Sequence, residues 1–347
     1  MATERIQIDD FLELARQHPV IDVRSPGEYN HAHIPGAHSL PLFTDDERKI
    51  VGTTYKQQSR EQAIKVGLDF FGPKMRKMLE EAERICPHAS KSRVLLVYCW
   101  RGGMRSAGMS WLMDLYGFRV YTLVGGYKRF RNYVLDTFRF PYSFQLIGGF
   151  TGSGKTELLK ALGVNGQAVI DLEALACHRG SAFGNIGMPK QPSQEMFENQ
   201  LALLLRQKSG DGRQTIWLED ESQRIGDLNI PHELWKTMRQ SPVQFLEIPF
   251  EERLKKIVLD YGPLDRQRLV SAIERITNRL GGLEAKKAIR FLQEDNITES
   301  FRILLTYYDK FYLKSLHNRD NLNSLLRKIP CKTVESANAE KLLLQSR

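Results

Sequence analysis

The sequence predicts an α/β protein built from two domains, and two glycine-containing loops are the main reason. The segments VYCWRGGMRS (97–106) and GFTGSGKT (149–156) each follow a short apolar run and precede a segment whose apolar residues recur at helical spacing. Each is therefore expected to connect a buried strand to a helix, which is the repeating unit of a parallel sheet. With 347 residues, the chain is long enough for two hydrophobic cores of ordinary size.

The first domain is expected to span residues 1–140. Strands are predicted at 19–23, 94–98 and 120–124, a turn-rich segment at 33–41, and helices around 61–84, 106–115 and 128–140. The segment PYSFQLIGG then starts a new strand, so the domain boundary is placed near Pro141.

The second domain is expected to span residues 141–347. Strands predicted at 144–148, 167–171, 215–218 and 243–248 alternate with helices, as in a second parallel sheet. Beyond residue 250 the chain is expected to be mostly helical.

Composition narrows the classes of function and location. The net charge of +9 favours a polyanionic partner, of which nucleic acid is the first candidate. The four cysteines form no C-x-x-C pair, so neither a zinc site nor a disulfide framework is indicated, and a reducing cytoplasm fits. The sequence has no apolar run of membrane-spanning length and no signal-peptide pattern, so a soluble cytoplasmic protein without a membrane partner is expected.

Cys99 is the candidate nucleophile of the first loop. Glycines permit a tight turn there, so backbone N–H groups and the N-terminal end of the next helix can converge on an anion. The same field, with the two loop arginines, is expected to favour the thiolate of Cys99, whereas an inert buried thiol is the alternative. The expected chalcogen or anion site comprises Cys99, Trp100, Arg101, Gly102, Gly103, Met104 and Arg105.

The second loop has the spacing G-x-x-x-x-G-K-T between a strand and a helix, which predicts a P-loop NTPase-like domain. Its backbone N–H groups can wrap a diphosphate, its lysine adds a positive charge, and the Thr156 hydroxyl is a candidate ligand for Mg²⁺. The expected diphosphate site comprises Gly149, Thr151, Gly152, Ser153, Gly154, Lys155 and Thr156. The motif leaves open whether the diphosphate belongs to a nucleotide or to another organic group.

Four carboxylates follow predicted strands of the second domain, and each has two interpretations. They are Asp171, Glu219, Asp220 and Glu221. Carboxylates at the ends of parallel strands lie at the ligand-binding edge of a sheet, but such residues are also frequent helix caps.

The first domain resembles the rhodanese family. The segment VIDVRSPGEYNHAHIPGAHSLP (20–41) contains the family's Asp-x-Arg, Glu-Tyr and His-Ile-Pro-Gly-Ala signatures. In rhodaneses the loop cysteine carries a chalcogen atom, and the resemblance implies that role for Cys99. Cys99 and Arg105 enclose five residues, the loop length of related cell-cycle phosphatases, so phosphate-ester hydrolysis stays open on loop length alone.

Five further segments resemble the tRNA 2-selenouridine synthases, which fuse a rhodanese domain to a P-loop domain. They are GGYKRFR (125–131), DLEALACHRGSAFG (171–184), QPSQEMFENQL (191–201), ESQRIGD (221–227) and RLGGL (279–283). The resemblance implies that wobble 2-thiouridine in a tRNA anticodon loop becomes 2-selenouridine through an S-geranylated intermediate. Geranyl diphosphate and selenophosphate would be substrates, with no tightly bound cofactor and with the selenophosphate-producing enzyme as a partner.

Contacts to tRNA are expected from basic residues. Lys128, Arg129 and Arg131 lie in the helix predicted to close the first domain, where Tyr127, Phe130, Tyr133 and Phe138 are interleaved with them. Positive charge and aromatic rings both suit nucleic acid, but the alternatives are a solvated face for the charges and a core position for rings at helical spacing. Arg179 and Arg224 lie within the family-like segments and are further candidates for phosphate or tRNA contacts.

Two functions of other classes stay open at this point. One is a P-loop small-molecule kinase or ATPase with a regulatory rhodanese-like or phosphatase-like domain. The other is a tRNA-binding module, which would need neither Cys99 nor Lys155.

Overall fold

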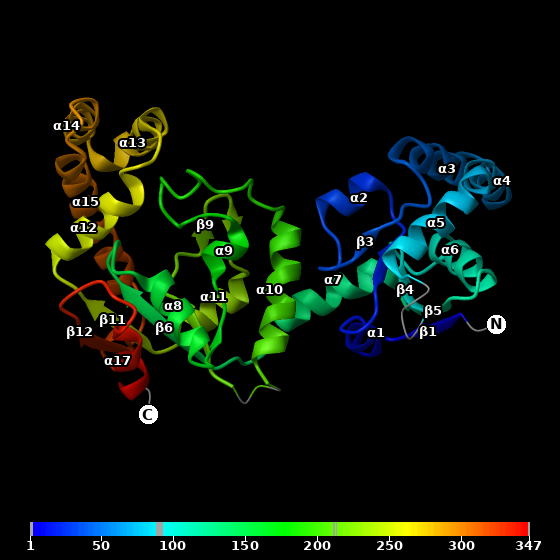
Figure 1. Cartoon of the computed structure of the whole chain (residues 1–347), viewed down its shortest axis with the longest axis horizontal. Helices are drawn as coiled ribbons and strands as arrows, with labels where there is room; N and C mark the ends of the chain where they lie inside the picture. The colour runs from blue at the N-terminus through cyan, green and yellow to red at the C-terminus, as the bar shows by residue number, and fades with distance from the viewer. Residues whose placement is uncertain (1–2, 88–92, 211, 213, 346–347) are drawn as a thin grey trace. The chain divides into compact units, whose positions relative to one another are not determined.

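The chain folds into two compact units, each with its own five-stranded sheet. Figure 1 shows the computed structural model, which describes residues 3–87, 93–210, 212 and 214–345. The units are Met1–Asp136 and Thr137–Arg347, so the division lies just before the expected boundary. Every strand pairing within the two five-stranded sheets is parallel, as the α/β prediction requires.

The sheet of the first unit has the order β1-β5-β4-β2-β3. The strands are β1 (Glu4–Ile6), β2 (Val20–Asp22), β3 (His38–Ser39), β4 (Val94–Tyr98) and β5 (Arg119–Leu123). The helices are α1 (Ile8–Leu14), α2 (Pro26–His31), α3 (Asp45–Gln57), α4 (Arg60–Phe71), α5 (Met75–Ile85), α6 (Met104–Leu115) and α7 (Gly126–Thr137). β4 is central and buried along its whole length, and the cysteine loop joins it to α6.

The helix predicted over 61–84 is interrupted. α4 and α5 are separated by the 3₁₀ turn Gly72–Lys74, which contains Pro73. Proline has no backbone N–H to donate and its ring clashes with the preceding helical turn, so a straight helix cannot continue through it.

The sheet of the second unit has the order β12-β11-β6-β8-β7. The strands are β6 (Phe144–Gly149), β7 (Ala168–Val169), β8 (Ile216–Glu219), β11 (Val243–Glu247) and β12 (Leu326–Pro330), and a separate hairpin pairs β9 (Arg224–Ile225) with β10 (Leu228–Asn229). The short helices beside them are α8 (Lys155–Val164), α9 (Leu172–Ala176), α10 (Gln194–Lys208), α11 (His232–Arg239), α16 (Leu322–Leu325) and α17 (Asn338–Gln345). β6 is central, with β11 on one side and β8 on the other. The P-loop follows the carboxyl end of β6, and ligands bind at this edge of open α/β sheets.

Four helices of the second unit pack around a core of their own (Figure 1). They are α12 (Phe250–Tyr261), α13 (Arg266–Leu280), α14 (Gly282–Gln293) and α15 (Ile297–His317). The expectation of a helical C-terminal part is met here, but it misses β12, which returns to the sheet beside β11. Among the described residues, no helix has both the length and the apolar character needed to cross a membrane.

Candidate active site

Cys99 directly follows β4, and its side chain is turned toward the start of α6. The residue is 3% exposed. Its Sγ accepts a hydrogen bond from the Gly103 backbone N–H at 3.3 Å and lies 3.3 Å from the Ser106 Oγ. Because Gly103 caps α6 and Ser106 lies in its first turn, the sulfur meets the positive end of that helix. This geometry suits an anion bound in the loop.

The arginine at the end of the loop is held by an ion pair. Arg105 Nη1 lies 2.8 Å from Glu28 Oε2, and Glu28 also pairs with Arg48 at 3.0 Å. Burial alone would raise the pKa of the Glu28 carboxyl, but the hydrogen bond and charge of Arg105 keep it below its ordinary value. Much of the Arg105 charge is thus compensated. Sequence reasoning missed Glu28 and Ser106 as loop partners, although Glu28 belongs to the Glu-Tyr signature.

The Asp-x-Arg signature stabilises the base of the cysteine loop. Arg24 pairs with Asp22 at 2.6 Å and donates to the Ala32 carbonyl at 2.7 Å, with both side chains almost wholly buried. The Tyr98 hydroxyl donates to Asp22 Oδ2 at 2.7 Å, and the Arg24 guanidinium lies 3.8 Å from the ring centroid of Tyr127. These residues fix the base of the loop and have no exposed face for a substrate.

Helix α7 begins against the backbone of the cysteine loop. The Tyr127 N–H donates to the Cys99 carbonyl at 2.8 Å, and the Lys128 N–H donates to the Trp100 carbonyl at 3.0 Å. Gly126 has φ +58°, and a Cβ there would lie 2.2 Å from the Cys99 carbonyl oxygen. Only glycine permits this approach, which explains the second glycine of the GGYKRFR segment.

The P-loop residues lie together around the N-terminus of α8. Gly149, Gly152 and Gly154 all have positive φ, which glycine adopts without strain. Lys155 is the first residue of α8, and its Nζ donates to the Gly149 carbonyl at 3.3 Å. The loop therefore presents a lysine and the positive end of a helix on one side of the sheet edge.

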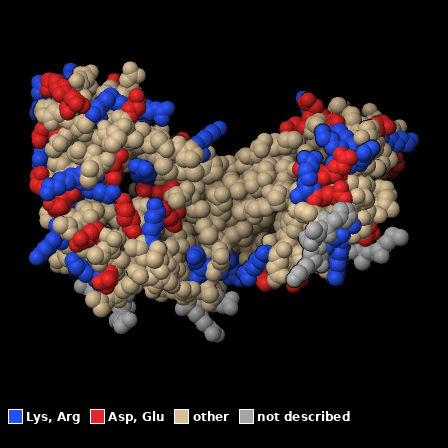
Figure 2. Space-filling model, in the orientation of Figure 1, with Lys and Arg blue, Asp and Glu red and all other residues tan. Residues whose placement is uncertain are grey.

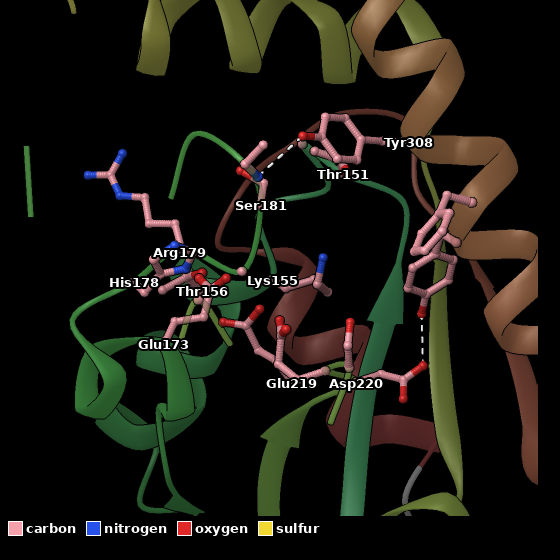
Figure 3. A pocket seen from close by; sticks show the side chains of 18 of the residues that line it. Thr151, Lys155, Thr156, Glu173, His178, Arg179, Ser181, Glu219, Asp220 and Tyr308 are labelled. Carbon is pink, nitrogen blue, oxygen red and sulfur yellow. Dashed lines mark hydrogen bonds between the residues drawn. The ribbon is translucent and has the colours of Figure 1, made fainter. Parts of the chain in front are cut away.

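A cavity of about 1160 Å³ opens from the P-loop. Figure 3 shows Lys155 beside it, with the carboxyl groups of Glu173 and Glu219 nearby. Arg179 and Arg224, expected from the family-like segments, both line this cavity. Pockets that hold a drug-sized ligand measure roughly 300–1,000 Å³. The cavity can therefore accommodate a diphosphate ester together with part of a second reactant.

Three carboxyl groups line the cavity near the lysine. Burial, followed by the charge of Glu221, raises the pKa of Glu173 to about 9, and burial, followed by the charge of Glu219, raises that of Glu221 to about 8. Burial also raises the pKa of Glu219, although Lys155 and a hydrogen bond from Thr156 oppose the shift. One oxygen of Glu219, Oε1, has no hydrogen-bond partner in the part of the chain that the structure describes.

The other two predicted carboxylates have structural partners. Asp171 caps α9 by accepting the Ala174 N–H at 2.8 Å, so the helix-cap interpretation holds for it. Asp220 pairs with Arg319 at 2.6 Å and accepts from the Tyr312 hydroxyl at 2.9 Å. Within the described ranges, no three His, Cys, Asp or Glu side chains are grouped to hold a metal ion. Sequence reasoning missed Glu173, which lies inside the DLEALACHRGSAFG segment.

Known protein families match both units. The tRNA 2-selenouridine synthase AAA domain matches residues 142–336, and the rhodanese-like domain matches residues 7–133. The chain belongs to the tRNA 2-selenouridine synthase family. The expected family resemblance is thereby confirmed.

Relatives within this family cover nearly the full length. The tRNA 2-selenouridine synthase of Nitrosomonas europaea is 39% identical over 371 residues, covering 92% of this chain and 94% of the relative. That of Cupriavidus pinatubonensis is 34% identical over 330 residues, covering 85% and 87%. A solved N-terminal domain of a Clostridium difficile 630 protein is 39% identical, with a TM-score of 0.34, covering 38% of this chain and 99% of that domain.

Two of the segments that resemble the family meet at His178. The ring is packed so closely that a Cβ on Gly184 or on Gly226 would lie 2.7 Å from it. DLEALACHRGSAFG supplies His178 and Gly184, and ESQRIGD supplies Gly226. His178 and Gly226 both line the cavity, so the two segments meet at its surface.

Most of the aromatic residues considered for nucleic acid in and beside α7 are part of the core. Tyr127, Phe130 and Phe138 are at most 3% exposed, so the core interpretation holds for these three rings, whereas Tyr133 is half-buried. Their helical spacing places them on the apolar face of the segment. Lys128 and Arg129 are exposed and Arg131 is half-buried, so contacts from this helix to tRNA stay a prediction.

Proposed function

We propose that this protein converts 2-thiouridine at the wobble position of tRNA into 2-selenouridine in two steps. Sulfur is first alkylated by geranyl diphosphate, and the geranylated sulfur is then replaced by selenium from selenophosphate. The observation that supports the proposal is that one chain of this family has two glycine-containing strand-to-helix loops, each following a central strand of its own sheet. Relatives over most of the chain are named tRNA 2-selenouridine synthase.

The P-loop cavity is the proposed place of alkylation. The sulfur of 2-thiouridine attacks C1 of the geranyl group, the C–O bond breaks, and the diphosphate leaves with the electron pair. The N3 proton of the base is lost as the C2–N3 double bond forms. Lys155 and the N–H groups at the start of α8 stabilise the charge that develops on the leaving diphosphate.

Magnesium fits the same position. The Thr156 hydroxyl and the buried Glu219 carboxylate, whose Oε1 lacks a partner among the described residues, are oxygen donors of the kind Mg²⁺ prefers. Mg²⁺ usually takes one or two carboxylates and completes its shell with water and substrate phosphates. When bound there, it would neutralise part of the diphosphate charge.

The cysteine loop is the proposed place of selenium transfer. Backbone N–H groups and the N-terminal end of α6 favour an anion beside Cys99, which suits selenophosphate. The selenium of selenophosphate, held beside Cys99, would attack C2 of the base, so that the C2–S bond breaks and geranylthiol leaves. Water then cleaves the P–Se bond, which releases phosphate and leaves 2-selenouridine. Alkylation matters because it makes the sulfur a better leaving group.

Mass spectrometry of tRNA nucleosides tests this sequence. With geranyl diphosphate alone, the protein should produce S-geranyl-2-thiouridine, and with both donors it should produce 2-selenouridine. Selenophosphate alone should leave 2-thiouridine unchanged. ATP turnover without any change in tRNA would support the kinase or ATPase function instead, and hydrolysis of aryl phosphates requiring Cys99 would support a phosphatase.

A further inference from the structure

The cavity has an aromatic side that the diphosphate alone does not explain. Tyr307, Tyr308 and Phe311 of α15 line it, and these three residues are called the aromatic wall below. The rings of Tyr307 and Phe311 are stacked, with centroids 6.3 Å apart and planes inclined by 27°. Phe311 is 52% exposed. Large aromatic surface that faces a cavity is surface that a ligand can remove from water.

The aromatic wall is fastened to the P-loop at two points. The Gly149 N–H donates to the Tyr312 hydroxyl at 3.3 Å. Arg253 donates to the Thr151 carbonyl at 3.1 Å and to Asp309 Oδ1 at 2.8 Å. Tyr312 and Asp309 belong to the same helix as the aromatic wall, so the wall stands at a fixed distance from the loop that holds the phosphates.

The two ends of the cavity differ in chemistry. One end offers backbone N–H groups and Lys155, which suit a diphosphate. The other end offers aromatic rings, with Ile276 and Leu316 also in the lining. Tyr308 also joins the aromatic wall to the DLEALACHRGSAFG segment, because its hydroxyl accepts the Ala182 N–H at 3.3 Å (Figure 3). This polarity fits a diphosphate ester of an apolar group.

We propose that the aromatic wall binds the isoprenoid chain of the diphosphate held by the P-loop, and that its fixed distance from the loop selects the chain length. The inference rests on the proposed function, because it takes geranyl diphosphate as the donor. It adds that α15 is the element that distinguishes this donor from shorter prenyl diphosphates and from inorganic diphosphate.

Calorimetric titration of the full-length protein tests the inference. The ligands are inorganic diphosphate and the dimethylallyl, geranyl and farnesyl diphosphates. The unaltered protein should bind geranyl diphosphate at least tenfold more tightly than inorganic or dimethylallyl diphosphate, because the longer isoprenoid chain removes more apolar surface from water. Tyr307→Ala and Phe311→Ala should each weaken geranyl diphosphate about tenfold while leaving inorganic diphosphate unchanged. Phe311→Trp should disfavour farnesyl diphosphate most, because it shortens the space.

Leu313→Ala is the matched control, since Leu313 is a partly exposed apolar residue on the same helix that does not line the cavity. It should bind all four ligands as the unaltered protein does. If the variants keep the preference for geranyl diphosphate, the inference is overturned while the proposed function stands. If they instead lose tRNA affinity alone, the wall stacks a base, which also overturns it. An unaltered protein that neither prefers geranyl diphosphate nor forms S-geranyl-2-thiouridine overturns the proposed function and the inference with it.

Discussion

Three buried carboxyl groups surround the lysine of the P-loop, those of Glu173, Glu219 and Glu221. Burial raises the pKa of each of them. The pKa values of Glu173 and Glu221 are raised to about 9 and about 8, so both are largely neutral at pH 7. Buried carboxylates so close together repel one another, and protonation relieves the repulsion. The folded protein therefore holds protons that the unfolded chain would release.

Glu221→Gln should make stability less dependent on pH. In the unfolded chain the Glu221 carboxyl loses its proton near its ordinary pKa of 4.5, but in the folded protein it keeps it until about pH 8. The free energy of unfolding should therefore fall as pH rises between these values. Glutamine cannot ionise, so the variant should melt at a higher temperature than the unaltered protein at pH 9, with a smaller difference at pH 5. Melting curves from pH 5 to 9 measure this, with the exposed Glu274→Gln as control, and parallel pH profiles for Glu221→Gln would contradict it.

Cys99→Ala should separate the two proposed steps. The variant should form S-geranyl-2-thiouridine at close to the normal rate and no 2-selenouridine, because only the second step uses the selenophosphate site beside Cys99. Nucleoside mass spectrometry gives both products from one digest. Cys86→Ala removes another buried thiol of the same unit and should leave both products unchanged. Normal 2-selenouridine from Cys99→Ala would rule out this role for the cysteine.

Lys155→Ala should slow geranylation by at least tenfold, because the diphosphate loses a charge-assisted contact worth roughly 1.5–3 kcal/mol. Steady-state rates at several geranyl diphosphate concentrations measure the loss. Lys236→Ala removes an exposed lysine outside the cavity lining and serves as the control. Unchanged kinetics in Lys155→Ala would mean that the P-loop binds a different ligand.

At the scale of elements, α12 and α15 are joined by two ion pairs in different surroundings. Arg253 and Asp309 lie 2.7 Å apart with side chains that are 3% and 16% exposed, whereas Arg302 and Glu251 are 35% and 62% exposed. Burial raises the pKa of Asp309, although Arg253 opposes the shift. The buried pair also touches the P-loop through the Thr151 carbonyl.

Asp309→Asn should destabilise the protein by about 3–5 kcal/mol, because it leaves the buried Arg253 charge without its partner. Glu251→Gln, which breaks the exposed pair between the same two helices, should cost much less, because water screens that pair. Urea unfolding measures both. Asp309→Asn should also weaken diphosphate binding, because it releases the arginine that supports the P-loop. Equal costs for the two variants would contradict this view of the connection.

The elements also show why part of the fold could be predicted from the sequence. β4 and β6 are buried central strands followed by glycine-rich motifs, so an apolar run and a spacing were enough to place both loops. β12 was missed because it is an edge strand with only Ile329 buried, so it lacks a continuous apolar run. The aromatic wall could not be predicted either, because its exposure depends on how α15 packs against the P-loop.

At the scale of the whole molecule, the net charge of +9 is the excess of 50 Lys and Arg residues over 41 Asp and Glu residues. On the face shown in Figure 2, Lys and Arg side chains lie among Asp and Glu side chains in both units. The buried rings of α7 leave its exposed basic side chains as the part that can contact phosphate.

Replacing Lys128 and Arg129 together by alanine should weaken tRNA binding and reduce its salt dependence. Each lost phosphate contact lowers the slope of log affinity against log salt by about 0.7–0.9. Binding isotherms at several salt concentrations measure the slope, and affinity for geranyl diphosphate should stay unchanged. The double variant Lys286→Ala and Lys287→Ala removes the same charge from exposed positions of α14 and should keep the normal slope. A normal slope and affinity in the first variant would exclude α7 as a tRNA contact.

The hydrogen bonds between α7 and the cysteine loop constrain how such a chain can be assembled by gene fusion. A recombination point just after β5 would remove the N–H groups that satisfy the Cys99 and Trp100 carbonyls, along with the ring on which Arg24 stacks. A recombined gene must therefore keep α7 together with the rhodanese-like unit. The crossover is best placed where that helix ends, near Thr137.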